Sequence, residues 1–189
     1  MAGRCFLILH GWLGNGPEHW QRWLTQRLRD AGETVSYPAL PDPERPRPGA
    51  WLAAVDAELD RLPGPPVVLC HSLACLLWLH HADRAPAPGR ALLVAPPSAT
   101  TGIEELEPFF PAPAGPVLAP GSRVVCSDDD PYCPEGAASV YGRLGVPVDV
   151  VPGGGHLNAD TGYGPWPEVE AWSLGQLDSA VTSSRMAPG

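Results

Sequence analysis

The sequence predicts a single compact α/β domain whose mostly parallel sheet is flanked by helices. Short apolar runs that suit buried strands alternate with segments whose apolar residues recur every three or four positions, as on one face of a helix. The 189 residues are enough for one domain with a complete core, and no internal repeat or second domain is evident. We expect the domain to span residues 1–182 and residues 183–189 to form a flexible tail.

The expected strands are apolar runs bounded by glycine, proline or polar residues. They lie at residues 5–9, 34–37, 67–70, 91–95, 123–126 and 147–151. The expected helices lie at residues 17–30, 49–62, 73–82, 134–144 and 167–181. Trp20, Leu24 and Leu28 share one face of the first helix, and Pro17 stands near its first turn. Trp51, Val55 and Leu59 share one face of the second helix.

Prolines separate these elements. The segment 38–48 holds five prolines and is expected to be a loop. Residues 63–66, Pro-Gly-Pro-Pro, end the second helix. The proline-rich segment 96–121 is expected to be irregular, with room for a short helix at 103–110.

Composition and charge exclude several classes of partner. The net charge is −9, and the twelve basic residues, all arginine, are scattered, so neither nucleic acid nor an anionic membrane is an expected partner. No apolar run approaches the ~18 residues of a membrane span, and residues 6–9 are too short for a signal-peptide core, so we expect a cytoplasmic protein. Its five cysteines form no Cys-x-x-Cys pair and are expected to be reduced and buried. Nothing distinguishes a monomer from a dimer.

The segment 67–74, Val-Val-Leu-Cys-His-Ser-Leu-Ala, is the strongest functional signal. A strand runs directly into Ser72, and small residues stand two positions to either side of it. This is close to the Gly-x-Ser-x-Gly nucleophile elbow, in which a serine sits on a strained turn between a strand and a helix. Cys70 and Ala74 replace the two glycines. By itself the motif is weak, because a serine after a strand can simply be the N-cap of the next helix.

The loops that follow three of the strands carry a serine, an acid and a histidine in that order. Acyl transfer needs each type: the serine attacks a carbonyl, a neutral imidazole takes its proton, and a carboxylate orients the imidazole. His156 is the expected base, because it follows the last strand in a glycine-rich loop that could swing toward Ser72. A lone loop histidine is otherwise most often a solvated side chain. The order of the three residues favours catalysis.

Asp130 is the expected acid, because it ends an acidic run after the fifth strand and precedes Pro131, which favours an extended backbone. Asp128 and Asp129 are the alternatives. The run could also be a solvated turn that caps the following helix. A metal site is not expected, because no histidine lies beside the run and successive extended residues point in different directions.

An oxyanion hole requires two backbone N–H groups. We expect one from Leu73, which follows the nucleophile, and the other from Trp12 in the loop after the first strand, with Leu13 as the alternative. The side chains expected to line the pocket are Leu13, His19, Phe109 and Tyr132. His19 could equally be the cap of the first helix. Of the other histidines, His10 is expected to be structural, His71 to point away from Ser72, and His80 and His81 to be surface or packing residues.

Several motifs resemble the small α/β-hydrolases of the retinoblastoma-binding-protein-nine/YdeN type. The matching segments are His10-Gly11-Trp12-Leu13-Gly14, His19-Trp20-Gln21-Arg22-Trp23-Leu24, Cys70-His71-Ser72-Leu73-Ala74, Asp129-Asp130-Pro131-Tyr132, Gly155-His156-Leu157-Asn158 and Gly164-Pro165-Trp166-Pro167. The resemblance implies a fold without a separate lid domain, no cofactor, and Ser72, Asp130 and His156 as nucleophile, acid and base. Cys70 and Ala74 depart from the family's glycines. Because they are larger, they call into question how fast the elbow works.

Three functions follow as hypotheses. The first is a serine hydrolase that cleaves small carboxylic esters through an acyl-Ser72 intermediate. The second keeps the same residues but acts on thioesters, or transfers or cyclises the acyl group in a biosynthetic pathway. The third is a degenerate hydrolase fold that serves as a protein-binding module. This hypothesis is based on the altered nucleophile elbow.

Overall fold

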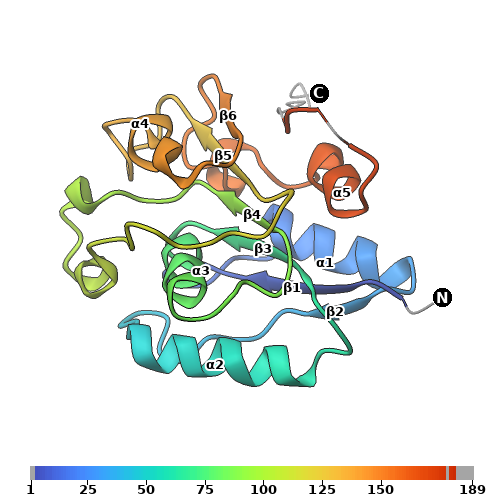
Figure 1. The fold of residues 1–189 in the computed structure, drawn as a ribbon. Coiled ribbons are helices and arrows are strands. Elements are labelled where there is room, and N and C mark those ends of the chain that lie inside the picture. The colour runs from blue at the N-terminus through green and yellow to red at the C-terminus, as the bar shows by residue number, and fades with distance from the viewer. Residues whose placement is uncertain (1–2, 178, 182–189) are drawn as a thin grey trace.

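The computed structural model of the chain describes residues 3–177 and 179–181. Six strands form one sheet in the order β2-β1-β3-β4-β5-β6 (Figure 1). All neighbouring strands are parallel, which confirms the predicted α/β class. The strands are β1 (Cys5–Leu9), β2 (Thr34–Ser36), β3 (Val67–His71), β4 (Ala91–Val94), β5 (Arg123–Ser127) and β6 (Val148–Val151).

Helices cover both faces of the sheet (Figure 1). They are α1 (Trp20–Asp30), α2 (Pro48–Arg61), α3 (Leu73–Arg84), α4 (Ala137–Tyr141) and α5 (Pro167–Ser173). Short 3-10 helices form at η1 (Ala99–Thr101), η2 (Glu104–Phe109), η3 (Gly142–Leu144) and η4 (Ala159–Thr161). Successive side chains of a strand point to opposite faces, so Phe6 and Ile8 join the core under α1 and α5, whereas Leu7 and Leu9 join the core under α2, α3 and α4.

The strand order places a crevice beside β1 and β3. The chain leaves β1 for its outer neighbour β2, and it leaves β3 in the opposite direction, for β4. The connections that follow β1 and β3 therefore diverge, and open α/β sheets bind ligands at this point. The loop after β1 begins at His10 and Ser72 directly follows β3, so both lie at the edge where the crevice opens.

Two helices differ from their predicted limits. The first starts at Trp20 instead of residue 17, because His19 has an extended backbone and is its N-cap. The last was predicted to run to residue 181 but ends at Ser173. Gly175 there adopts a left-handed conformation with φ +71°, which a right-handed helix cannot continue. The predicted tail, residues 183–189, and the domain boundary at residue 182 lie outside the described residues.

The fourth predicted helix, residues 134–144, is also shorter in the structure. Gly136 has φ +81°, so regular helix begins only at Ala137, and a 3-10 turn follows it from Gly142. The short helix expected at 103–110 is the 3-10 helix η2. All five cysteines are buried and none forms a disulfide. Among the residues that the structure describes, no helix has both the length and the apolarity needed to cross a membrane.

Candidate active site

Ser72 occupies a strained turn between β3 and α3. Its backbone angles, φ 56° and ψ −125°, lie in a region that residues other than glycine rarely adopt. Two backbone hydrogen bonds hold the turn, from Ser72 N to the Val94 carbonyl at 2.9 Å and from Cys75 N to the Ser72 carbonyl at 2.9 Å. Ser72 is the N-cap residue of α3, but its hydroxyl makes no capping hydrogen bond, so capping does not explain a serine at this position.

The residues beside Ser72 fit the turn despite their size. The side chains of Cys70 and Ala74 are completely buried and belong to the core beneath α3. Gly11, from the loop after β1, meets the turn from the other side. A Cβ atom on Gly11 would lie 2.8 Å from Ser72 Cβ, closer than real Cβ atoms approach, and a tight 3.0 Å from the His71 carbonyl oxygen. Glycine is therefore required at position 11 rather than at the two usual elbow positions.

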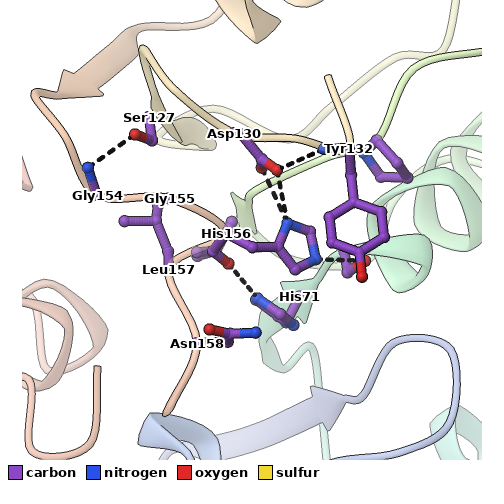
Figure 2. Close-up of polar contacts among 12 residues, drawn as sticks. His71, Ser127, Asp130, Tyr132, Gly154, Gly155, His156, Leu157 and Asn158 are labelled. Atoms are coloured by element: carbon purple, nitrogen blue, oxygen red, sulfur yellow. Dashed lines mark hydrogen bonds and ion pairs between the residues drawn. The ribbon is translucent and has the colours of Figure 1, made fainter. Parts of the chain in front are cut away.

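His156 joins Ser72 to Asp130 (Figure 2). Its Nε2 lies 3.0 Å from Ser72 Oγ, and its Nδ1 lies 3.0 and 2.9 Å from the two carboxylate oxygens of Asp130. All three side chains are buried. The backbone N–H of Tyr132 donates to Asp130 Oδ1 at 2.9 Å, and the Tyr132 ring lies 4.2 Å from the His156 ring, centre to centre. The carboxylate can thus accept from Nδ1–H and leave Nε2 free to accept from the serine hydroxyl.

The rest of the acidic run binds the backbone of the histidine loop. Three successive glycine N–H groups each donate to a different side chain of the run. Gly153 donates to Asp128 Oδ1 at 2.7 Å, Gly154 to Ser127 Oγ at 2.9 Å, and Gly155 to Asp129 Oδ1 at 2.7 Å. Figure 2 shows the Ser127–Gly154 contact beside His156. The loop is therefore held in place, and the expectation that it is free to swing toward Ser72 is wrong.

His71 supports the same loop from below. Its Nε2 donates to the His156 carbonyl at 3.0 Å (Figure 2), so its proton is on Nε2. Burial, with smaller effects from the neighbouring rings of His19 and His156, holds the pKa of His71 well below its usual value, so it stays neutral near pH 7. His10 is also buried, and its Nε2 accepts a hydrogen bond from the Leu40 N–H at 3.0 Å. This contact agrees with the structural role expected for His10.

The two backbone N–H groups expected for an oxyanion hole belong to residues next to the nucleophile in the sequence or in space. Leu73 is the first residue of α3, so its N–H has no acceptor within the helix. Trp12 follows Gly11, which touches Ser72. The alternative donor, Leu13, is already used: its N–H donates to the Pro43 carbonyl at 2.9 Å. Of the N–H groups expected from the sequence, those of Trp12 and Leu73 therefore remain the candidates for an oxyanion hole.

A cavity of about 290 Å³ opens over Ser72 and His156. Of the expected lining residues, the cavity wall includes Leu13, His19 and Tyr132. The expectation that Phe109 lines the pocket is wrong. Its side chain is fully buried in the core against Trp51 and is not part of the cavity wall. His19 combines both of its expected roles, since it lines the cavity and its Nδ1 caps α1 by accepting from the Gln21 N–H at 3.2 Å.

Comparison with known proteins identifies the family. The family model described as serine hydrolase matches residues 6–173. The chain belongs to this serine hydrolase family. The YdeN protein of Bacillus subtilis (strain 168) is 26% identical over 171 residues, which cover 86% of this chain and 90% of YdeN.

Solved structures agree with this serine hydrolase in fold. The ydeN gene product of B. subtilis aligns with a TM-score of 0.76 at 20% identity, covering 93% of this chain and 100% of that chain. A YdeN-like hydrolase from Pectobacterium atrosepticum aligns with a TM-score of 0.73 at 20% identity, covering 92% and 93% of the two chains. The predicted resemblance to the YdeN-type α/β-hydrolases is therefore confirmed.

Several residues of this serine hydrolase site were not expected from sequence. Leu106 of η2 and the residues 158–160 after the histidine line the cavity. The roles of Ser127, Asp128 and Asp129 in holding the glycine loop were also not predicted. The sequence offered one indication of this contact, which was that residues 127–129 carry hydrogen-bond acceptors after β5 and residues 153–155 are glycines after β6. Their pairing depends on β5 and β6 being neighbours in register.

Proposed function

We propose that this serine hydrolase cleaves small carboxylic esters through an acyl-Ser72 intermediate, with His156 as general base and acid and Asp130 as the orienting carboxylate. The observation that carries the proposal is the continuous set of contacts from Ser72 Oγ through both nitrogens of His156 to Asp130. A serine hydroxyl becomes nucleophilic when such a base accepts its proton in the transition state.

The reaction has two halves. In the first, Ser72 Oγ bonds to the ester carbonyl carbon while its proton moves to His156 Nε2, and the Leu73 and Trp12 N–H groups stabilise the oxyanion. The C–O bond then breaks, and the alcohol leaves with the proton from Nε2. In the second half, water loses a proton to Nε2 and attacks the acyl carbon. The bond between the acyl carbon and Ser72 Oγ then breaks, Nε2 returns the proton to Oγ, and the carboxylic acid leaves.

The cavity supports a small substrate. Its volume of about 290 Å³ is at the lower limit of the ~300 Å³ pockets that hold drug-sized ligands. The exposed side chain of Leu13 stands at its rim and the buried side chain of Leu106 in its wall, so part of the surface suits an apolar acyl or alcohol group. We expect short-chain esters to be cleaved better than long-chain esters.

A fluorophosphonate probe tests the proposal directly. Wild-type protein is expected to gain the probe mass on Ser72, and the Ser72→Ala variant, with unchanged thermal unfolding, is expected not to react. Hydrolysis of a chain-length series of p-nitrophenyl esters, with thioesters in parallel, reports the preferred bond. Labelling that persists in Ser72→Ala, or a wild-type protein that neither reacts nor hydrolyses any ester, would refute the proposal.

Gly11→Ala is expected to lower kcat by about a hundredfold or more, because its new Cβ displaces the loop that presents the Trp12 N–H. The matched control is Gly49→Ala at the start of α2, where a new Cβ meets no atom within 4 Å. Ester hydrolysis and thermal unfolding would be measured for both variants. Unchanged kcat in a correctly folded Gly11→Ala protein would show that the loop does not need its present position.

A further inference from the structure

His19 has a second ring nitrogen that the fold does not use. The side chain is only 3% exposed, and its Nε2 has no hydrogen-bond partner among the described residues. Buried polar groups are nearly always paired, so an unpaired one calls for an explanation. The residue also lines the cavity that holds Ser72 and His156. The unpaired nitrogen therefore belongs to a residue of the substrate cavity.

The cap of α1 determines which nitrogen carries the proton. His19 Nδ1 accepts from the Gln21 N–H at 3.2 Å, so it must present a lone pair. In a neutral imidazole the proton is then on Nε2. Burial, with smaller effects from the nearby His156 and Arg22 side chains, lowers the pKa of His19 to about 3, so the ring is neutral at physiological pH. Nε2–H is thus a fixed, neutral donor.

Helix capping alone does not explain a histidine at this position. Serine, threonine, aspartate and asparagine are the preferred N-cap residues, and each would accept from the helix N–H without burying a second polar atom. The His19 ring also packs edge-on against His71, with ring centres 4.6 Å apart, and His71 in turn supports the His156 carbonyl. The His19 ring is therefore linked through His71 to the backbone of His156, one of the proposed catalytic residues.

We propose that His19 Nε2–H donates a hydrogen bond to an oxygen of the substrate other than the scissile carbonyl, so that the preferred esters carry a second, uncharged acceptor on their acyl or alcohol part. The inference rests on the proposed ester hydrolysis and adds a substrate class to it. A donor held in place before binding discriminates against analogues that lack the acceptor, because its desolvation is then uncompensated. His19 is accordingly a specificity-determining residue.

The test separates this role from helix capping. His19→Ser and His19→Asn keep a side-chain acceptor for the Gln21 N–H, whereas His19→Ala removes both the cap and the donor. Thermal unfolding identifies the loss of the cap. Two ester series would be assayed, in which an ether oxygen replaces each methylene of the acyl chain, or of the alcohol chain, in turn. For each ether, kcat/KM would be divided by kcat/KM of its methylene parent. Comparing this ratio between wild type and the His19 variants removes the difference in chemical reactivity between the two esters.

Wild-type protein is expected to prefer at least one ether over its parent by about tenfold, the effect of one neutral hydrogen bond. In His19→Ser the ratio should fall to near that of the uncatalysed reaction. A wild type without such a preference, or a preference that persists in His19→Ser, overturns the inference. Fluorophosphonate labelling of Ser72 in the same samples shows whether the proposed function still stands.

Discussion

His156→Ala is expected to lower kcat by about a millionfold, the scale seen when the base of a serine hydrolase is removed. In this structure His156 is the residue whose imidazole contacts both Ser72 Oγ and the Asp130 carboxylate. Without it, the serine hydroxyl has no acceptor for its proton and the leaving alcohol has no donor. Steady-state hydrolysis of a p-nitrophenyl ester, supported by active-site titration, gives the measurement.

The control for this substitution is His80→Ala. His80 lies on α3, where its Nε2 contacts the Phe109 carbonyl at 2.8 Å and not the nucleophile. We expect His80→Ala to retain most of the wild-type kcat. If His156→Ala keeps more than about one-hundredth of the wild-type kcat, another group must act as the base.

Asp130→Asn is expected to lower kcat by about ten-thousandfold while KM and thermal unfolding change little. The Tyr132 N–H donates to Asp130 Oδ1 and will hold the amide oxygen at that position. The amide NH₂ then faces His156 Nδ1 and favours the tautomer with its proton on Nε2. That tautomer cannot accept the proton of Ser72.

Asp128→Asn is the matched control, since it makes the same chemical change two residues away. Asp128 accepts only from the Gly153 N–H in this region, and an amide oxygen can accept equally well. We expect kcat to stay within a few-fold of wild type. Comparable losses in Asp128→Asn and Asp130→Asn would mean that the acid cannot be assigned from the observed contacts and that the whole run acts together.

Cys70 and Ala74 do not crowd Ser72 in the way that the sequence suggests. In the sequence they break the glycine pattern of the elbow, and the extra atoms suggest crowding at Ser72. In the structure both side chains point into the core beneath α3, and the close approach to Ser72 is made by Gly11 instead. A motif that records only the residues beside the serine cannot show this, because Gly11 comes from the loop after β1, far from Ser72 in the sequence.

Local patterns were sufficient for most of the fold. Strand positions were predicted closely, because apolar runs bounded by proline and glycine depend on neighbouring residues alone. The final helix was overextended because its end depends on the left-handed Gly175 and on Arg90, which directly precedes β4 and donates to the Trp172 and Ser173 carbonyls. Neither effect is part of the helical periodicity of residues 167–181.

The sequence by itself determined the α/β class and the order of serine, acid and histidine on loops at the same edge of the sheet. Both follow from local periodicity and from the rule that parallel strands end together. Only the tertiary structure decided which of three adjacent carboxylates meets His156, that the Leu13 N–H is bound to the Pro43 carbonyl, and that His19 both caps a helix and lines the cavity. These choices depend on contacts between residues far apart in the chain, and strand register and loop closure determine those contacts.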